Sequence, residues 1–225
     1  INIGGTVAGD TITVEIDHFT KFAVMAIAKT KVEEPVEPEA EDKVVNLTDI
    51  TGHWAQKNIE QLVASGAVGG YPDGTFKPDN TITRAEFVTI LVKAFKPENK
   101  GEKTFNDTVS HWAKDYISCA VANGIVTGYD TNTFGPDDLV TREQMAVMIY
   151  KAAKLSPAAE ETQFTDSGSI SGWAKEAIAT ATRNGIMKGY PDNTIQPQGS
   201  ATRAEAVTVI VNALNKTGES DRKDK

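Results

Sequence analysis

One arginine recurs in three copies of a short motif, as Arg84, Arg142 and Arg203. In each copy a Thr stands directly before the Arg, and a Glu or Gln stands two residues after it. The motif predicts that the Arg opens a helix, where the helix dipole favours an acid over a cation. The same unfavourable choice at three equivalent positions indicates a local task. We infer that these guanidinium groups hold an anion.

Each motif also carries the residues that start a helix. A Thr at the N-cap and a Glu or Gln three residues later form a capping box, in which each side chain accepts a hydrogen bond from the other residue's backbone amide. The predicted pairs are Thr83 with Glu86, Thr141 with Gln144, and Thr202 with Glu205. Free amides at such a helix end attract anions, which supports the role inferred for the arginines.

Further markers recur at fixed distances from these motifs. A Trp lies 30 residues before each Arg, as Trp54, Trp112 and Trp173. A Gly-Tyr pair begins 16 residues after each Trp, as Gly70 and Tyr71, Gly128 and Tyr129, and Gly189 and Tyr190. Such a period indicates tandem repeats. The predicted bounds of the repeats are 47–100, 101–159 and 160–216.

Each repeat has the pattern of a helix, a loop rich in turn residues and a second helix. The second helix is apolar nearly all round, as Phe87, Val88, Leu91 and Phe95 illustrate for the first repeat. Such a helix must be buried on several sides, and a unit of about 50 residues cannot bury it alone. We therefore predict a mostly α fold in which three such helices meet around an approximate threefold axis. The first helix and loop of each unit would project as a lobe, with a groove between neighbouring lobes.

The flanking segments differ from the repeats. Residues 1–30 show apolar alternation at Ile12, Val14 and Ile16 and an apolar run over 19–27, which predict β-strands that belong to an upstream domain. Residues 31–46 are rich in Glu and Pro and predict an extended linker. Residues 217–225 are polar and predict a disordered tail. Because the chain begins at Ile1 without a signal peptide, we interpret it as part of a longer precursor.

The totals exclude several classes of function. The net charge is −8, without the clustered basic face of a nucleic-acid-binding protein. No apolar run approaches the roughly 20 residues that a membrane-spanning helix needs. The His residues and the single Cys119 lack zinc spacing, and the loop acids lack the calcium-loop pattern, so we expect no metal or other cofactor. These loop acids are Asp73, Asp130 and Asp192.

We expect no catalytic residues, because a motif repeated three times argues against a unique active site.

Three tandem copies of a Trp-Ala pair, a Gly-Tyr-Pro-Asp-Gly-Thr-Phe loop and a Thr-Arg-Ala-Glu motif over residues 47–215 resemble the S-layer homology domain family. The resemblance implies a three-lobed arrangement of tandem units in an extracellular, wall-associated protein of a bacterium. It implies non-covalent anchoring of that protein to a secondary cell-wall polysaccharide, commonly one with pyruvate ketals. It also implies that the motif arginines and the Gly-Tyr segments bind the glycan. The matching residues are Arg84, Arg142, Arg203, Gly70, Gly128, Gly189, Tyr71, Tyr129 and Tyr190.

The second repeat departs from the pattern, because its motif is Thr-Arg-Glu-Gln. Glu143 places an acid beside Arg142, so the sequence supports a glycan site in that groove less strongly than in the other two. The three Trp are interpreted as core anchors in preference to sugar platforms, whereas the tyrosines either stack on a sugar ring or fill the lobe. Each Arg has the alternative of a surface ion pair with a neighbouring Asp. Capping or structural roles are predicted for Asp49, Asp107 and Asp166.

Two other functions fit the same sequence. One is direct binding to peptidoglycan, and the other is a structural role in S-layer lattice assembly. For the favoured function the expected partner is an acidic glycan, and we expect the isolated chain to be a monomer.

Overall fold

The computed structural model describes residues 6–8, 11–13, 47–98, 101, 103–158 and 162–223, and the chain divides into the units Ile1–Glu41 and Asp42–Lys225. In the first unit, β1 (Thr6–Ala8) and β2 (Thr11–Thr13) pair antiparallel, with Val7 opposite Ile12. β2 overlaps the start of the first predicted strand at Ile12, whereas its partner β1 lies before the predicted residues. The predicted strand over 19–27 and the linker over 31–46 lie outside the described residues.

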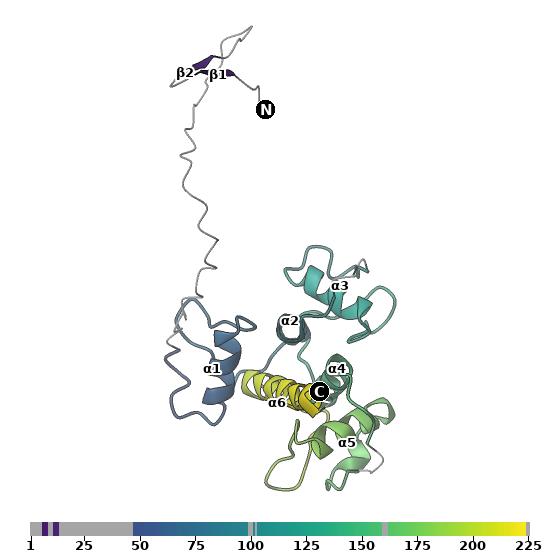
Figure 1. Ribbon diagram of the computed structural model, residues 1–225. Helices are drawn as coiled ribbons and strands as arrows, with labels where there is room; N and C mark the ends of the chain where they lie inside the picture. The colour runs from purple at the N-terminus through teal and green to yellow at the C-terminus, as the bar shows by residue number, and fades with distance from the viewer. Residues whose placement is uncertain are drawn as a thin grey trace. The chain divides into compact units, whose positions relative to one another are not determined.

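The second unit is helical and contains the three predicted helix–loop–helix repeats (Figure 1). The first helices of the repeats are α1 (Gln56–Ala64), α3 (Lys114–Ala122) and α5 (Lys175–Arg183). The second helices are α2 (Arg84–Phe95), α4 (Arg142–Ala152) and α6 (Arg203–Lys223). Two short 3-10 turns, Ser167–Ser169 and Gly172–Ala174, precede α5. The second helices contact one another pairwise at the centre, so the predicted mostly α fold is confirmed.

The second helices begin at the Thr-Arg motifs. The Thr83 hydroxyl accepts a hydrogen bond from the Glu86 amide at 3.2 Å, and the Glu86 carboxylate accepts one from the Thr83 amide at 3.0 Å. The equivalent pairs of bonds join Thr141 with Gln144 and Thr202 with Glu205. These reciprocal bonds are the capping box that the Thr-x-x-Glu/Gln spacing predicts.

Each first helix packs against the second helix of the preceding repeat. The contacting pairs are α3 with α2, α5 with α4, and α1 with α6 (Figure 1). The last pair joins the first repeat to the third and closes a ring. Each first helix therefore lies against a helix of another repeat, a pairing that the sequence did not reveal.

The backbone closes the same ring at the axis. The Ile82 amide donates to the Ala201 carbonyl at 3.1 Å, the Ala201 amide to the Val140 carbonyl at 2.9 Å, and the Val140 amide to the Ile82 carbonyl at 3.1 Å. These three side chains are fully buried. A cycle of bonds from three repeats satisfies polar groups that water cannot reach.

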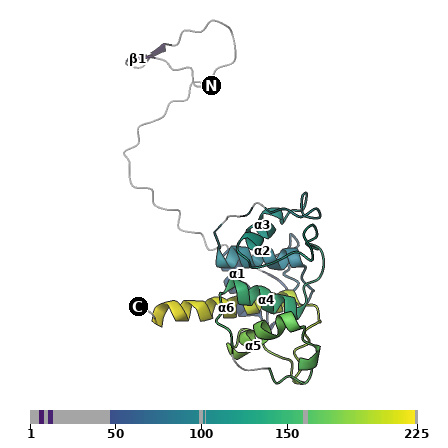
Figure 2. The same ribbon diagram turned by 90° about the vertical axis from the view of Figure 1, so that its right-hand side faces the viewer.

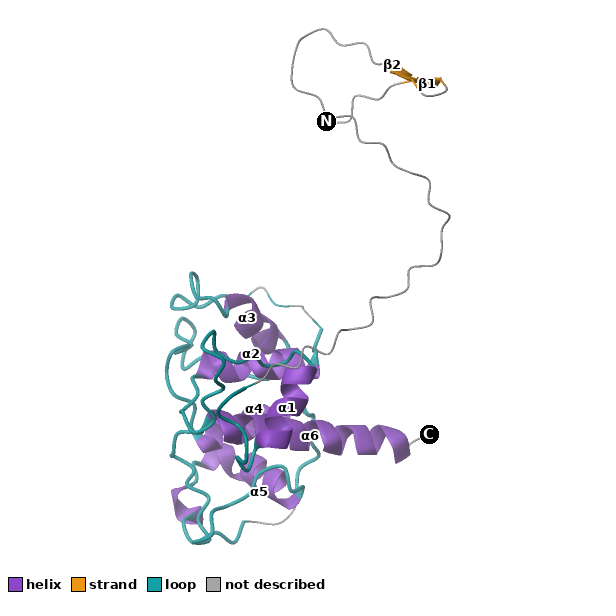
Figure 3. Ribbon diagram, turned by 90° about the vertical axis from the view of Figure 1, so that its left-hand side faces the viewer, coloured by secondary structure: helices purple, strands orange, loops and turns teal. Residues whose placement is uncertain are grey.

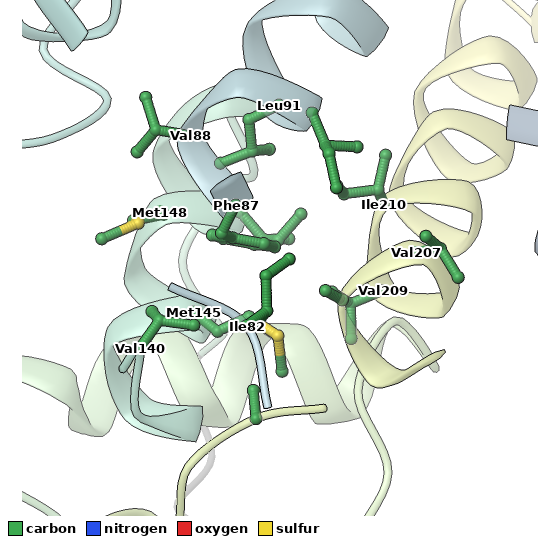
Figure 4. Packing of buried hydrophobic residues seen from close by; sticks show 14 of the residues in the cluster. Ile82, Phe87, Val88, Leu91, Val140, Met145, Met148, Val207, Val209 and Ile210 are labelled. Carbon is green, nitrogen blue, oxygen red and sulfur yellow. The ribbon is translucent and has the colours of Figure 1, made fainter. Parts of the chain in front are cut away.

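The core lies between the three second helices. Figure 4 shows Phe87 and Leu91 of α2 close to Met145 of α4 and to Ile210 of α6. These four side chains are fully buried. The apolar surface that one repeat cannot cover alone is thus covered by the other two.

The loops lie together on the side of this unit opposite the C-terminal end of α6 (Figure 3). An aspartate fixes the loop of each repeat. In the first repeat, the two oxygens of Asp49 accept hydrogen bonds from the Phe76 and Lys77 amides, each at 2.7 Å. Lys77 has a φ of 56°, an uncommon left-handed conformation for a residue with a side chain. Asp107 and Asp166 make the equivalent pairs of bonds in the other repeats.

The C-terminal segment differs from our prediction. We predicted a disordered tail over 217–225, whereas α6 continues to Lys223 and projects beyond the other helices (Figure 2). No Pro interrupts this segment, and helix extension adds one hydrogen bond for each residue that is fixed. The Thr217 hydroxyl also donates to the Ala213 carbonyl at 3.2 Å, within the helix.

The central core generates a stability prediction. Leu91→Ala should lower the free energy of unfolding by about 2–5 kcal/mol, because it opens a cavity at a fully buried position between repeats. Thermal and urea unfolding would measure the change. Val109→Ala is the matched control, since Val109 is 57% exposed and should change stability by less than about 0.5 kcal/mol. An unchanged unfolding midpoint for Leu91→Ala would contradict the packing described above.

The aspartate bonds generate a pH prediction. Partial burial acts to raise the pKa of Asp49, but the hydrogen bonds from the Phe76 and Lys77 amides outweigh it and lower the pKa below its ordinary value. A lowered folded-state pKa gives stability that is present above the unfolded-state pKa and is lost as the pH falls through the folded-state pKa. Asp49→Asn should therefore lower the melting temperature at pH 7 and have a smaller effect near pH 3. Melting curves at both pH values measure this. An equal effect at both would show that the charge of the Asp49 carboxylate does not contribute to stability.

Candidate functional site

The three motif arginines are buried. Arg84, Arg142 and Arg203 retain 3%, 3% and 6% of their exposure. Each side chain leaves its own repeat and enters the loop of the next one around the ring. The alternative role, a surface ion pair with a neighbouring Asp, does not fit because the arginines are buried.

Arg142 is the most fully bonded of the three. Its Nε donates to the Ile195 carbonyl at 2.8 Å, and its Nη2 donates to the Lys188 carbonyl at 2.9 Å. Its Nη1 forms an ion pair with Glu205 Oε1 at 2.7 Å. The guanidinium carbon lies 4.6 Å from the centre of the Tyr190 ring. The side chain of the second repeat is thus enclosed by the third.

Arg203 repeats this arrangement between the third repeat and the first. Its Nε donates to the Phe76 carbonyl at 2.9 Å, and its Nη1 lies 3.5 Å from Glu86 Oε1. The rings of Tyr71 and Phe76 lie 4.9 and 4.7 Å from the guanidinium carbon. The carboxylate partner is again the acid of the neighbouring capping box.

Arg84 connects the first repeat to the second through hydrogen bonds to backbone carbonyls. Its Nε donates to the Phe134 carbonyl at 3.2 Å, and its Nη2 donates to the Thr127 carbonyl at 3.3 Å. The rings of Tyr129 and Phe134 lie 4.5 and 4.7 Å from the guanidinium carbon. Gln144 takes the place that Glu205 and Glu86 hold in the other two sites. No ion pair of Arg84 occurs among the described residues.

The helix amides beside the arginines are not free, which corrects one of our expectations. The Arg84 amide donates to the Asp138 carbonyl at 2.9 Å, and the Ala85 amide donates to the Pro136 carbonyl at 2.9 Å. The first amides of α4 and α6 bond the next loop in the same way. Any attraction for an anion at these positions must therefore come from side chains.

A groove opens beside Arg84 and another beside Arg142. Their volumes are about 340 and 400 Å³, which falls in the range of small-ligand sites. Each groove combines the Arg of one repeat, the loop and second helix of the next, and the Trp of the third. The first is lined by Arg84, Gly128, Tyr129, Gln144, Lys151 and Trp173, among others. The second is lined by Arg142, Lys188, Gly189, Tyr190, Glu205 and Trp54, among others.

The three Trp lie on the surface, so their interpretation as core anchors is wrong. Trp54, Trp112 and Trp173 are 63%, 62% and 59% exposed. The adjacent Ala55 is fully buried, because the chain turns into α1 with Ala55, not Trp54, toward the lobe. Trp173 and Trp54 line the two grooves, where a flat apolar ring remains available for contact.

The glycines of the Gly-Tyr segments are required by close packing. A Cβ on Gly128 would lie 2.6 Å from the carbonyl oxygens of Asp130 and Thr133, which no folded chain tolerates. Gly70 and Gly189 are crowded in the same way by their own loops. Gly128 and Gly189 also line the grooves, so the structural reason and a place at the site coincide.

The tyrosines cover the arginines and differ between sites. Tyr190 is half-buried, and its hydroxyl donates to Glu205 Oε1 at 2.7 Å. Burial, followed by this hydrogen bond, raises the pKa of Tyr190 to about 12. Tyr129 is 53% exposed. Tyr71 is partly buried, and its ring contacts both Arg203 and Lys77. The tyrosine beside Arg84 is thus the most accessible.

Glu143 does not act on Arg142 in the way that we expected. Its carboxylate accepts hydrogen bonds from the Ser171 amide and hydroxyl at 3.0 and 2.9 Å and from the Gln198 side chain at 2.9 Å. It is 2% exposed and holds the third repeat to the second. The acid that neutralises Arg142 is Glu205, a partner that adjacency in the sequence did not reveal. No signal in the sequence pairs the two residues, because the contact joins two repeats whose packing order the motifs do not specify.

The remaining loop acids act as turn residues. Asp73 Oδ1 accepts from the Thr75 amide at 3.0 Å and from its hydroxyl at 2.6 Å, and Asp192 does the same with Thr194. Within the described residues, no group of three or more His, Cys, Asp or Glu is placed to hold a metal ion. In the same part of the chain, no helix is long and apolar enough to cross a membrane.

The S-layer homology domain family matches three segments, 46–88, 104–146 and 163–207, which together make up more than half of the chain. Each segment contains one Trp, one Gly-Tyr loop and one Thr-Arg motif.

Three relatives show how the match extends. The chain is 39% identical to a cellulosome-anchoring protein of Acetivibrio thermocellus, over 70% of this chain and 39% of that protein. It is 33% identical to an amylopullulanase of Thermoanaerobacterium thermosulfurigenes, over 96% of this chain and 11% of that protein. It is 28% identical to a surface-layer 125 kDa protein of Lysinibacillus sphaericus, over 91% of this chain and 18% of that protein. The chain thus spans well under half the length of each of these relatives.

Relatives named as enzymes and relatives named as surface or anchoring proteins share the same repeated region with this chain. That region is a binding module that is found at the outer surface of bacteria. With three such domains over more than half of its length, the chain belongs to the S-layer homology family, whose domains attach surface proteins to the bacterial cell wall.

Proposed function

We propose that this chain anchors an exported protein by binding a secondary cell-wall polysaccharide that carries carboxylate groups, with pyruvate ketals as the favoured source. Binding takes place in the grooves between repeats, through Arg84, Arg142 and Arg203. The observation that carries the proposal is a buried guanidinium at the edge of a groove that three repeats build together, with an exposed Trp beside it.

Several features of the grooves suit an acidic sugar. An arginine makes charge-assisted hydrogen bonds to a carboxylate, and each is worth roughly 1.5–3 kcal/mol. Trp173 and Trp54 offer exposed ring faces for the apolar face of a sugar ring. The arginine is already held by loop carbonyls, so little side-chain entropy is lost when a ligand binds.

A repeating polymer can engage more than one groove of the same molecule. Linked sites gain from effective concentration, so modest individual affinities combine into firm attachment. The third position, with Arg203, Gly70 and Tyr71, completes the set around the ring. We propose that the isolated chain is a monomer, because one copy supplies all three repeats.

Direct binding to peptidoglycan is the second candidate, and lattice assembly is the third. The exposed Trp are compatible with either, since large exposed apolar side chains also mark protein interfaces. Concentration-dependent oligomers in sizing experiments without glycan would favour lattice assembly. A monodisperse monomer under the same conditions would count against it.

The proposal predicts selective sedimentation with cell walls. The chain should sediment with purified wall sacculi and lose at least about tenfold in affinity after the secondary polymer is extracted from them, since the carboxylate contacts disappear. Quantified pull-down curves before and after extraction measure this. Undiminished binding to the stripped peptidoglycan would reject the polysaccharide and favour the second candidate.

The exposed Trp generate a second prediction. Trp54→Ala and Trp173→Ala should each weaken binding to native sacculi by about two- to tenfold, since an aromatic contact is worth about 0.5–1.5 kcal/mol. Their melting temperatures should stay near that of the unaltered chain, because both side chains are more than half exposed. Val109→Ala is the control for an exposed apolar residue outside the two grooves. Full binding by both Trp variants would remove these rings from the site.

A further inference from the structure

The groove beside Arg84 differs from its counterparts in the residue three positions after the N-cap. We propose that Gln144 makes the Arg84 groove the primary site for a sugar carboxylate, because the other two arginines already hold a carboxylate of their own chain. This inference rests on the proposed function and names which groove is occupied first.

In the groove of Arg142, Glu205 occupies the position beside the guanidinium that a ligand carboxylate would take. Its Oε2 accepts a hydrogen bond from the Thr202 amide at 2.9 Å and completes the capping box. Its Oε1 faces the groove and accepts from Arg142 Nη1 at 2.7 Å and from the Tyr190 hydroxyl at 2.7 Å. The carboxylate thus satisfies the free edge of the guanidinium and fixes the tyrosine over it. A ligand carboxylate must displace this bond in order to bind.

Glu86 divides its oxygens in the same way. Its Oε2 accepts from the Thr83 amide at 3.0 Å, and its Oε1 lies 3.5 Å from Arg203 Nη1. The longer distance makes a weaker pair than that of Arg142 and Glu205. The charge of Arg203 is nevertheless opposed by an acid from within the chain.

Gln144 reverses the polarity of this position. Its Oε1 accepts from the Thr141 amide at 3.2 Å, and only the oxygen of an amide can do so. The capping bond therefore turns the NH₂ group, a donor, toward the place that Oε1 occupies in Glu205. Beside Arg84, the chain presents a donor where its other two sites present an acceptor.

Arg84 keeps one edge available as a result. Its Nε and Nη2 bond loop carbonyls, and among the described residues its Nη1 has no acceptor in the protein. Because no buried side-chain nitrogen or oxygen of these residues lacks a hydrogen-bond partner, Nη1 is reached from the groove. Arg84 as a whole is nevertheless only 3% exposed, so its position is fixed before any ligand arrives.

The groove as a whole is cationic. Its described lining contains Arg84 and Lys151 and no Asp or Glu, whereas the groove of Arg142 contains Glu205. Burial lowers the pKa of Arg84 below its ordinary value, although the charges of Tyr129, Asp138 and Asp107 act to raise it. A bound carboxylate would supply the close counter-charge that the chain omits here.

The tyrosines beside the arginines also differ between the grooves of Arg84 and Arg142. Tyr190 is half-buried and its hydroxyl is bonded to Glu205, whereas Tyr129, over Arg84, is 53% exposed and its hydroxyl has no hydrogen-bond partner among the described residues. Tyr129 can therefore move to admit a sugar ring without breaking a hydrogen bond of its hydroxyl. Access and charge thus favour the same groove.

The test is a titration of the intact chain with two monosaccharides, a methyl hexoside with a 4,6-pyruvate ketal and methyl glucuronide, which separate the two sources of a sugar carboxylate. The ¹⁵Nε resonances of the three arginines are followed by NMR. Arg84 should respond at about tenfold lower ligand concentration than Arg142, since the ligand displaces no ion pair there. Gln144→Glu should weaken the response of Arg84 about tenfold, and Glu205→Gln should strengthen that of Arg142. Both substitutions keep a side chain that can cap the helix.

A second readout needs no ligand. Gln144→Glu should raise the melting temperature in the absence of sugar, because it gives Arg84 the ion pair that Arg142 has. Equal titration of Arg84 and Arg142, no response of Arg84 to either sugar, or an unchanged Arg84 response in Gln144→Glu would overturn the inference. Failure of the proposed function is distinguishable, since it would abolish sedimentation with polymer-bearing walls while the three arginines could still rank as described with the free sugars.

Discussion

A buried guanidinium that crosses from one repeat into the loop of the next is the interaction on which this structure depends. In the best-defined chain of contacts, Asp49 binds the Phe76 and Lys77 amides, and the Phe76 carbonyl accepts from Arg203. A buried charge is tolerated only where hydrogen bonds or an opposite charge replace water. The loop of one repeat must therefore be correctly formed before the arginine of its neighbour can be buried. This requirement links local loop geometry to the assembly of the whole ring.

Ring closure follows from the same contacts and makes the three repeats one cooperative body. Each first helix packs on the second helix of another repeat, and α1 packs on α6, from the two ends of the repeat array. In an open repeat array the terminal units have unsatisfied faces, whereas a closed ring leaves none. The grooves inherit this dependence, because each one takes its arginine, its loop and its Trp from three different repeats. The residues that line the grooves are thus also residues that hold the repeats together.

The sequence predicted what the period and the local chemistry determine. The Thr-x-x-Glu/Gln spacing located the starts of α2, α4 and α6, and the all-round apolar pattern placed these helices at the centre. The sequence did not predict the surface position of Trp54, because a large aromatic residue next to a helix start is compatible with either face. Nor did it pair Arg142 with Glu205, since that contact joins two repeats whose mutual order only the fold defines. Local rules do not specify which repeat packs on which.

The three repeats have the same capping box but differ in the charge of one of its residues. The residue three positions after each N-cap must accept one amide hydrogen bond, and Glu and Gln both do so. The capping box therefore tolerates a change of charge that leaves the helix start intact but alters the neighbouring arginine. Under the proposed function, a polymer would meet sites of unequal strength at fixed separations, and the strongest would raise the effective concentration of sugar at the others. The fold thus separates the residues that folding requires from one position whose charge, under the proposed function, sets the order in which the grooves are occupied.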